Sequence, residues 1–197
     1  MATLRLFTAL ELPAPVRRQL ADLITALSAA LPRGSVRWVR PEGIHLTLKF
    51  YGEVGGDKLA SLQAVVKEAA LGVAALKLEL SGLGTFPNPS RPRVIWAGLE
   101  GDIGRLKALQ RAVEFASERL GFAPEARGFT PHLTLGRAEP GWRPADRQSL
   151  EDALARLGLG VRGAFTADTL VLMRSDLRPG GAVYTPQATA TLIGSAD

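Results

Sequence analysis

Both histidines of the 197-residue chain are followed by the same three residues, HLTL at 45–48 and HLTL at 132–135. An unperturbed imidazole titrates near neutrality, so one member of a pair can accept a proton while the other donates one. Two imidazoles, with hydroxyls to hold the non-bridging oxygens, suit displacement at phosphorus without a metal. A 2′,3′-cyclic phosphate fits this chemistry, because its ring is strained and one ring oxygen leaves.

Each motif alternates polar and apolar residues, as expected for a strand with one buried face. His45 therefore shares a face with Thr47, and His132 shares a face with Thr134. Side chains two positions apart in a strand are separated by roughly 6.5–7 Å. An imidazole and a hydroxyl at that separation can contact different atoms of one small anion.

The residues after the first motif extend this pattern. Phe50 continues the buried leucine face, while Lys49 lies on the His45 face or points to water at the strand end. One such motif is most simply structural, because threonine is a common strand former. Finding every histidine of the chain in the same pattern has a chance on the order of one in ten thousand from typical composition, which favours a shared function.

Composition excludes several kinds of site. The chain has no cysteine, hence no disulfide, thiolate metal site or cysteine nucleophile, and two histidines are too few for a histidine-rich metal site. No apolar run is long enough to span a bilayer, and charges interrupt the N-terminal apolar stretch, so we expect a cytoplasmic protein. The net charge of +5 and the abundance of arginine suit phosphate or RNA partners, or equally heat adaptation or genome composition.

Strands and helices alternate around the motifs. Hydrophobic periodicity predicts helices over 16–31, 59–69, 103–120 and 149–158, with Asp57 and Asp102 as N-caps. It predicts strands over 4–12, 36–41, 44–54, 76–86, 94–100, 128–137, 165–177 and 183–193. A short turn is expected between 36–41 and 44–54, and another at 178–181. Short links between strands favour an α+β fold with antiparallel or mixed sheets. The repeated motif predicts two similar lobes within one compact unit over residues 1–197.

The paired motifs resemble those of the two-histidine phosphoesterase superfamily, which is defined by two H-x-T-x sequences. Further stretches resemble, nearly end to end, the bacterial and archaeal RNA 2′,3′-cyclic phosphodiesterases, also called 2′-5′ RNA ligases. These stretches are RLFTALELP, VRWVRPEGIHLTLKFYGEV, RPRVIWAGLE, FTPHLTLGR and the Gly-Gly-x-x-Tyr at 180–184. The resemblance implies a bilobal fold with pseudo-twofold symmetry, in which two sheets flank a central cleft and the helices lie outside.

The same resemblance implies an activity and residue roles. The activity is hydrolysis of RNA 2′,3′-cyclic phosphate ends to 2′-phosphates, without metal or cofactor, and 2′-5′ ligation is the reverse use of the centre. His45 would donate a proton to the leaving 3′ oxygen, and His132 would be the base for water. Thr47, Thr134 and Arg137 would bind the phosphate. We expect RNA partners, tRNA fragments among them, no membrane association, and a monomer.

Two alternatives to this enzyme remain open. A non-catalytic protein could bind RNA ends or phosphate in the same cleft, although arginine or lysine would then serve as well as histidine. A phosphodiesterase with the same centre could instead act on 2′,5′-linked oligonucleotides or small cyclic nucleotides. Arg91 and Arg93 could grip RNA at the cleft rim or lie on a solvated loop.

The aromatic residues divide into two groups. Three could stack a nucleobase or simply pack in the core: Phe7, Phe129 and Tyr184. Among the tryptophans, we expect Trp38 and Trp96 in the core and Trp142 as the anchor of a loop.

Overall fold

A computed structural model describes residues 3–126, 128–178 and 181–194, so the predicted turn at 178–181 lies partly outside the described residues. The strands are β1 (Thr3–Leu10), β2 (Val36–Trp38), β3 (Leu46–Gly55), β4 (Leu76–Phe86), β5 (Val94–Gly101), β6 (His132–Ala138), β7 (Ala164–Ala167), β8 (Thr169–Arg178) and β9 (Gly181–Thr191). The α-helices are α1 (Ala14–Ala30), α2 (Leu59–Ala70), α3 (Ile103–Glu118) and α4 (Pro144–Gly158). Two short 3₁₀ helices are η1 (Pro41–Gly43) and η2 (Gly56–Lys58).

The strands form two sheets, and all pairings in the described part of the chain are antiparallel. Sheet A has the strand order β3-β1-β8-β9, and sheet B has the order β2-β6-β5-β4-β7. His45 immediately precedes β3, which begins with the rest of the first motif, and the second motif begins β6, so each sheet carries one motif. The two motif strands contact each other although they belong to different sheets. The expected α+β fold with two sheets is confirmed.

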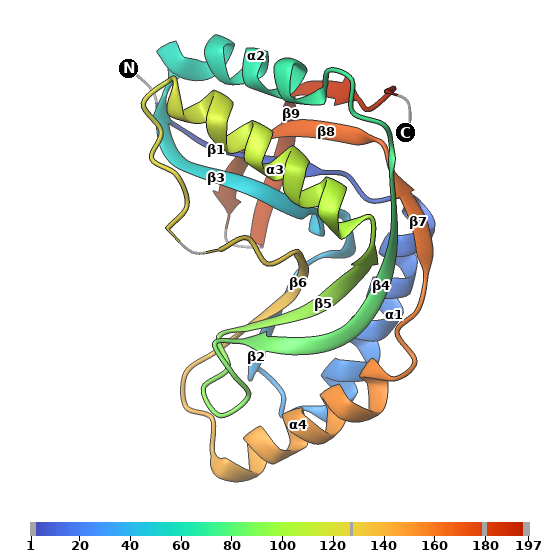
Figure 1. Ribbon diagram of the computed structural model, residues 1–197. Coiled ribbons are helices and arrows are strands. Elements are labelled where there is room, and N and C mark those ends of the chain that lie inside the picture. Colours follow the sequence, from blue (N-terminus) through green and yellow to red (C-terminus); the bar gives the residue numbers. More distant parts are fainter. Residues whose placement is uncertain (1–2, 127, 179–180, 195–197) are drawn as a thin grey trace.

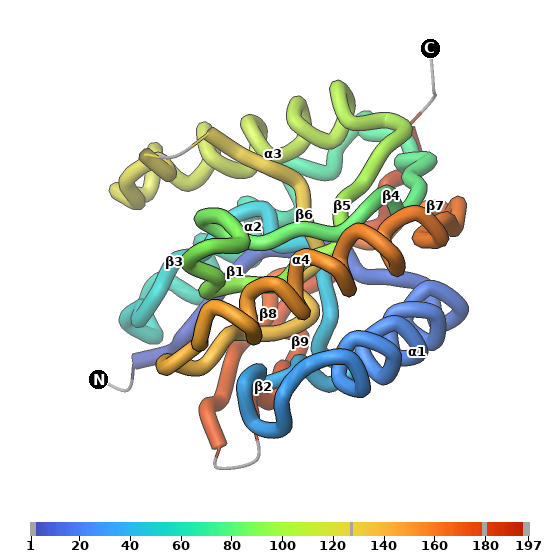
Figure 2. Tube along the Cα trace, turned by 90° about the horizontal axis from the view of Figure 1, so that it is seen from below, coloured from blue at the N-terminus to red at the C-terminus, as the bar shows by residue number. Residues whose placement is uncertain are grey.

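The helices cover each sheet on one side. Helices α2 and α3 pack together against sheet A, and α1 and α4 pack side by side over sheet B (Figures 1 and 2). Two of the helices cover the sheet to which the preceding strand does not belong. Helix α1 follows a strand of sheet A but covers sheet B, and α3 follows a strand of sheet B but covers sheet A. Buried leucines of both sheets and all four helices form one large cluster that supports the motif strands from behind.

Two strand predictions were wrong. The segments 36–41 and 44–54 were expected to be joined by a simple turn, but β2 pairs in sheet B and β3 in sheet A, with η1 between them. The predicted strand 165–177 divides at Asp168 into β7 in sheet B and β8 in sheet A. The alternating pattern gives no sign of the two places where the chain passes from one sheet to the other. It indicates only which side chains are buried locally, and not which sheet provides the partner strand.

Helix starts also differ from the prediction. Asp57 lies within η2, and α2 begins after it without a side-chain cap. Asp102 precedes α3, but its carboxylate accepts the backbone N–H of Lys77 at 2.8 Å, so it fastens the helix start to β4. Helix α4 begins at Pro144, earlier than predicted, because proline suits the first helical turn and Asp146 accepts the backbone N–H of Arg143 at 2.9 Å.

Candidate active site

The two histidines are oriented by the same backbone contact. The Nδ1 of His45 lies 2.8 Å from the carbonyl oxygen of Gly43, and the Nδ1 of His132 lies 2.7 Å from that of Thr130. A carbonyl can only accept, so Nδ1–H is the donor in both contacts and Nε2 is left unprotonated in the neutral ring. Each imidazole can therefore use Nε2 to take up or release a proton.

A β-bulge follows the threonine of each motif. The pairing of β3 with β1 skips Leu48, and the pairing of β6 with β5 skips Leu135, the corresponding residue. An extra residue shifts the alternation of side chains by one position. The third residue after each threonine, rather than the second, thereby joins the histidine face. That residue is Phe50 in the first motif and Arg137 in the second, and both are exposed.

The shift corrects the prediction for two residues. Phe50, expected in the core, is 45% exposed, whereas Lys49, expected near the histidine or in water, is only 5% exposed. The Nζ of Lys49 forms an ion pair with Glu114 of α3 and donates to the carbonyl of Ala123 at 2.9 Å. Gln110 also donates to Glu114, at 3.1 Å. This polar network joins the first motif strand to α3 and to the segment that leads toward the second motif.

His45 lies among aromatic rings of sheet A. Phe7 of β1 stacks on the imidazole with ring centroids 4.5 Å apart, and Tyr184 of β9 contacts its edge at 5.0 Å. Burial lowers the pKa of His45 to about 4, although the hydrogen bond to Gly43 acts in the opposite direction. His45 is therefore neutral near pH 7 in the unliganded protein.

His132 has a different aromatic neighbour. Phe86 of β4 contacts the imidazole edge-on at 5.0 Å and packs in turn on Trp96 of β5 at 5.2 Å. Trp96 was expected in the core but is only partly buried. It is paired with Thr134 and lies over Gly84, where a Cβ would overlap the indole. Its Nε1 is buried and has no hydrogen-bond partner among the described residues. Phe86 and Trp96 thus form an aromatic wall on the His132 side of the site.

Arg137 connects the two sides of the site. Burial raises the pKa of the Tyr184 hydroxyl, while the positive charges of Arg137 and Arg5 partly counteract that effect. Arg137 of sheet B thus acts electrostatically on a tyrosine of sheet A that itself contacts His45. Arg137 is exposed on the strand of the second motif, three residues after Thr134, so its cation is free to attract a phosphate.

The two motif threonines complete the polar lining. Thr47 and Thr134 are partly exposed, and their hydroxyls make no hydrogen bond to other described residues. They are free to donate to an oxyanion held between the motifs. Within the described ranges, no three His, Cys, Asp or Glu side chains are grouped so that they could hold a metal ion. No helix in that part of the chain is long and apolar enough to cross a membrane.

The remaining sequence candidates fall in several places. Phe129 and Trp38 pack against the core, and Trp142 donates its Nε1 to the carbonyl of Ser35 at 3.2 Å, which confirms its role as an anchor. Arg91 and Arg93 are exposed on the loop between β4 and β5. Sequence reasoning missed Phe86, because strand alternation does not show that its face of β4 meets the histidine of β6.

Comparison with known proteins is consistent with this geometry. The model of the LigT-like phosphoesterase family matches residues 10–96 and 99–184, and each matched stretch contains one motif. An RNA 2′,3′-cyclic phosphodiesterase of Methanothermobacter thermautotrophicus is 34% identical over 181 residues, which cover 92% of this chain and 95% of that protein.

Two solved structures are similar over almost their whole length. TT0787 of Thermus thermophilus is 30% identical, with a TM-score of 0.76 and coverage of 98% of this chain and 100% of that one. LigT of E. coli, solved in complex with 3′-AMP, is 26% identical, with a TM-score of 0.73 and coverage of 96% and 98%.

Proposed function

Because the chain belongs to the LigT-like phosphoesterase family and is a cyclic phosphodiesterase, we propose that it hydrolyses RNA 2′,3′-cyclic phosphate ends to 2′-phosphates. One observation carries the proposal. Two imidazoles on contacting strands are held by equivalent Nδ1 contacts, which leave both Nε2 atoms for proton transfer. The two lobes act together as one catalytic unit over residues 1–197, with no metal and no cofactor.

The proposed roles follow the order of bond changes at phosphorus. Nε2 of His132 takes a proton from the attacking water, and Nε2 of His45 gives a proton to the departing 3′ oxygen. Thr47, Thr134 and Arg137 hold the non-bridging oxygens, where negative charge increases in the transition state. His45 is neutral in the unliganded protein, so it must gain its proton before it can donate. The anionic substrate favours this step, because a nearby negative charge raises the pKa of an imidazole.

The same centre can also join RNA ends. A 5′-hydroxyl takes the place of the attacking water, and its attack on the cyclic phosphate then forms a 2′-5′ linkage. Both histidines belong to one chain, so a monomer is sufficient for either reaction. The proposed RNA ends include those of tRNA fragments.

Two other activities compete with this proposal. A pure RNA-end binder would have no use for two imidazoles with free Nε2 atoms, which favours the enzyme. A phosphodiesterase acting on 2′,5′-linked oligonucleotides or small cyclic nucleotides would use the same residues. Residues outside the two motifs must therefore decide which of these substrates is selected.

The deciding experiment incubates the EDTA-treated protein with a short RNA that ends in a 2′,3′-cyclic phosphate. We expect a 2′-phosphate product at a rate that EDTA does not change. A 3′-phosphate product would reverse the assignment of the leaving oxygen. Activity that is lost with EDTA and restored by a divalent ion would refute the metal-free mechanism. Tight binding without any product would favour the RNA-end binder.

A further inference from the structure

A cavity of about 440 Å³ lies beside the end of β6, beyond the second motif. The loop between β4 and β5 contributes Arg91 and Arg93 to its lining, and the segment that leads into α4 contributes Glu139 and Trp142. Arg147, in the first turns of α4, completes the basic lining. The two segments lie side by side at the end of sheet B (Figure 1), and the backbone N–H of Ala138 donates to the carbonyl of Arg93 at 3.0 Å.

The arginines of this cavity are available to an anion. Within the described part of the chain, none of Arg91, Arg93 and Arg147 forms an ion pair. The one carboxylate in the lining, Glu139, is paired with Arg37 at 3.1 Å. The Nε of Arg147 is buried and has no partner among the described residues. No carboxylate of the lining compensates the charges of these three arginines, which favours an anionic ligand.

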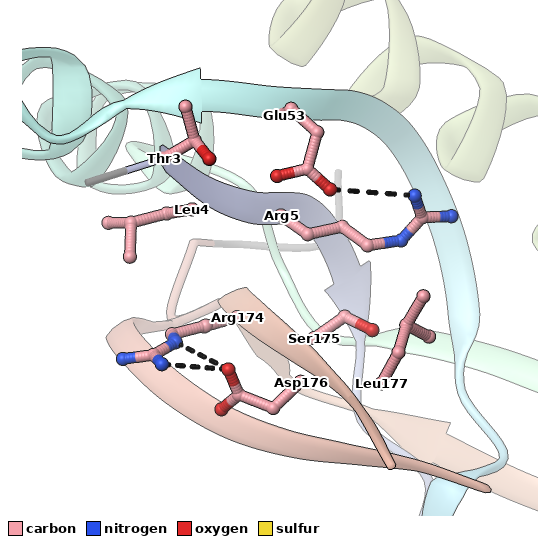
Figure 3. A pocket seen from close by; sticks show the side chains of 8 residues that line it. All are labelled: Thr3, Leu4, Arg5, Glu53, Arg174, Ser175, Asp176 and Leu177. Carbon is pink, nitrogen blue, oxygen red and sulfur yellow. Dashed lines mark hydrogen bonds and ion pairs between the residues drawn. The ribbon is translucent and has the colours of Figure 1, made fainter. Parts of the chain in front are cut away.

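A second cavity provides a comparison. It has a volume of about 230 Å³ and lies where β1 begins and β8 ends in sheet A, near Thr3 and Leu177 (Figure 3). Each of its arginines is matched with a carboxylate: Arg5 with Glu53 at 3.9 Å, and Arg174 with Asp176 at 2.7 Å. Its charges compensate one another, whereas those beside β6 do not.

The cavity beside β6 is also preformed. The side-chain oxygen of Asn88 accepts the backbone N–H of Arg91 at 3.0 Å and the hydroxyl of Ser90 at 2.7 Å, which fixes the arginine loop. Trp142 is held through its Nε1, and its carbonyl accepts Nη2 of Arg147 at 3.1 Å. An ordered arginine loop beside a held indole suits a nucleic acid strand, since guanidinium groups bind phosphates and aromatic faces stack on bases.

The position of the cavity indicates the size of its ligand. Ala138 is six positions after His132 along β6, a distance of at most about 20 Å at the usual rise of a strand. At the stacked spacing of about 3.4 Å per nucleotide this corresponds to about six nucleotides, and to fewer in an extended strand. Arg137 lies on the strand between His132 and the cavity residue Ala138. A mononucleotide cannot occupy both.

We propose that this cavity binds the phosphodiester backbone of the substrate RNA a few nucleotides before its cyclic end. The inference rests on the proposed function and narrows it: the preferred substrate is an oligonucleotide rather than a small cyclic nucleotide. Arg91, Arg93 and Arg147 contact phosphates, and Trp142 offers its face to a base. The contacts are to backbone and ring faces, so they select length and not sequence.

The test compares two substrates and two charge-matched variants. Arg91→Gln/Arg93→Gln removes charge from the cavity, while Arg18→Gln/Arg111→Gln removes the same charge from exposed positions on α1 and α3. We expect the first variant to lower kcat/KM about tenfold for a decamer with a cyclic end and to leave the value for 2′,3′-cyclic AMP unchanged. The second variant should change neither. Equal losses on both substrates, or an unchanged decamer value, would overturn the proposal.

Binding of the same decamer, labelled with a fluorophore, gives a readout that does not need turnover. The plot of log affinity against log salt should become shallower by about 1.4 in Arg91→Gln/Arg93→Gln, because two phosphate contacts are lost. An unchanged slope would rule out the cavity as an RNA site. If the wild-type protein hydrolyses neither substrate, the proposed function fails, while this measurement still decides the binding site.

Discussion

His45 and His132 share one backbone contact, an Nδ1–H donated to the carbonyl two residues earlier, but they differ in their surroundings. His45 is stacked on Phe7 and touched by Tyr184, whereas the ring beside His132 is Phe86. The shared contact presents Nε2 of both rings in the same tautomer. Burial among the rings of sheet A lowers the pKa of His45, although the motif that carries it is identical in sequence to the second one.

Removal of either imidazole should abolish turnover. We expect His45→Ala and His132→Ala each to lower kcat/KM for a cyclic-phosphate RNA at least about 1000-fold, because each removes one proton-transfer step. Circular dichroism and urea unfolding serve as controls for the fold. Retention of a tenth of the wild-type activity by either folded variant would contradict the paired mechanism.

The pH profile should extend further into acid than ordinary histidines allow. Two essential imidazoles produce a bell-shaped kcat/KM profile, and the lower of their two pKa values sets the acid limb whichever ring is the base. Since burial lowers the pKa of His45 to about 4, the pH at which half of the activity is lost on the acid side should be no higher than about 4.

A pair of Tyr184 variants tests the cause of that acid limb. Tyr184→Ala exposes His45 to water, so the limb should move upward by at least about one pH unit toward the ordinary value of 6.5. Tyr184→Phe keeps the ring contact and should leave the limb in place. If the wild-type protein already loses half of its activity near pH 6.5 on the acid side of the profile, burial does not lower the pKa of His45.

The stability of the protein should fall as the pH falls from 6.5 to 4. In that window the unfolded chain protonates His45 while the folded protein keeps it neutral, so the unfolded state binds more protons. We expect this residue to lower the free energy of unfolding by about 2 kcal/mol between pH 7 and pH 5. Urea unfolding of His45→Gln should show a smaller decrease, and equal decreases in both proteins would refute the prediction.

The ion pair between Lys49 and Glu114 should be strongly coupled. Lys49→Met leaves a largely buried carboxylate without its partner, and we expect a loss of about 3–5 kcal/mol in the free energy of unfolding. The double variant Lys49→Met/Glu114→Gln should cost less than the two single variants together. The half-exposed pair of Arg119 and Glu68 is the control, because Arg119→Met should cost at most about 1 kcal/mol. Additive losses in urea unfolding would show that the buried pair is not coupled.

Much of the site could be predicted because it depends on local pattern. The repeated H-x-T-x motif identified the histidines and threonines, and side-chain alternation placed each pair on one face of its strand. The alternating strands and helices were sufficient for the α+β class. These inferences concern residues within a few positions of one another, where backbone geometry alone relates one side chain to the next.

The amino-acid sequence by itself thus indicated the two histidines and two threonines as the candidate site, most of the strands, and the family. Only the tertiary structure decided that a bulge exchanges Lys49 for Phe50 on the histidine face and brings Arg137 to the corresponding place. It also decided that burial makes His45 neutral and that unpaired arginines gather at the end of β6. Bulges, burial and charge clusters depend on which distant segments pack together, and local periodicity carries no record of those partners.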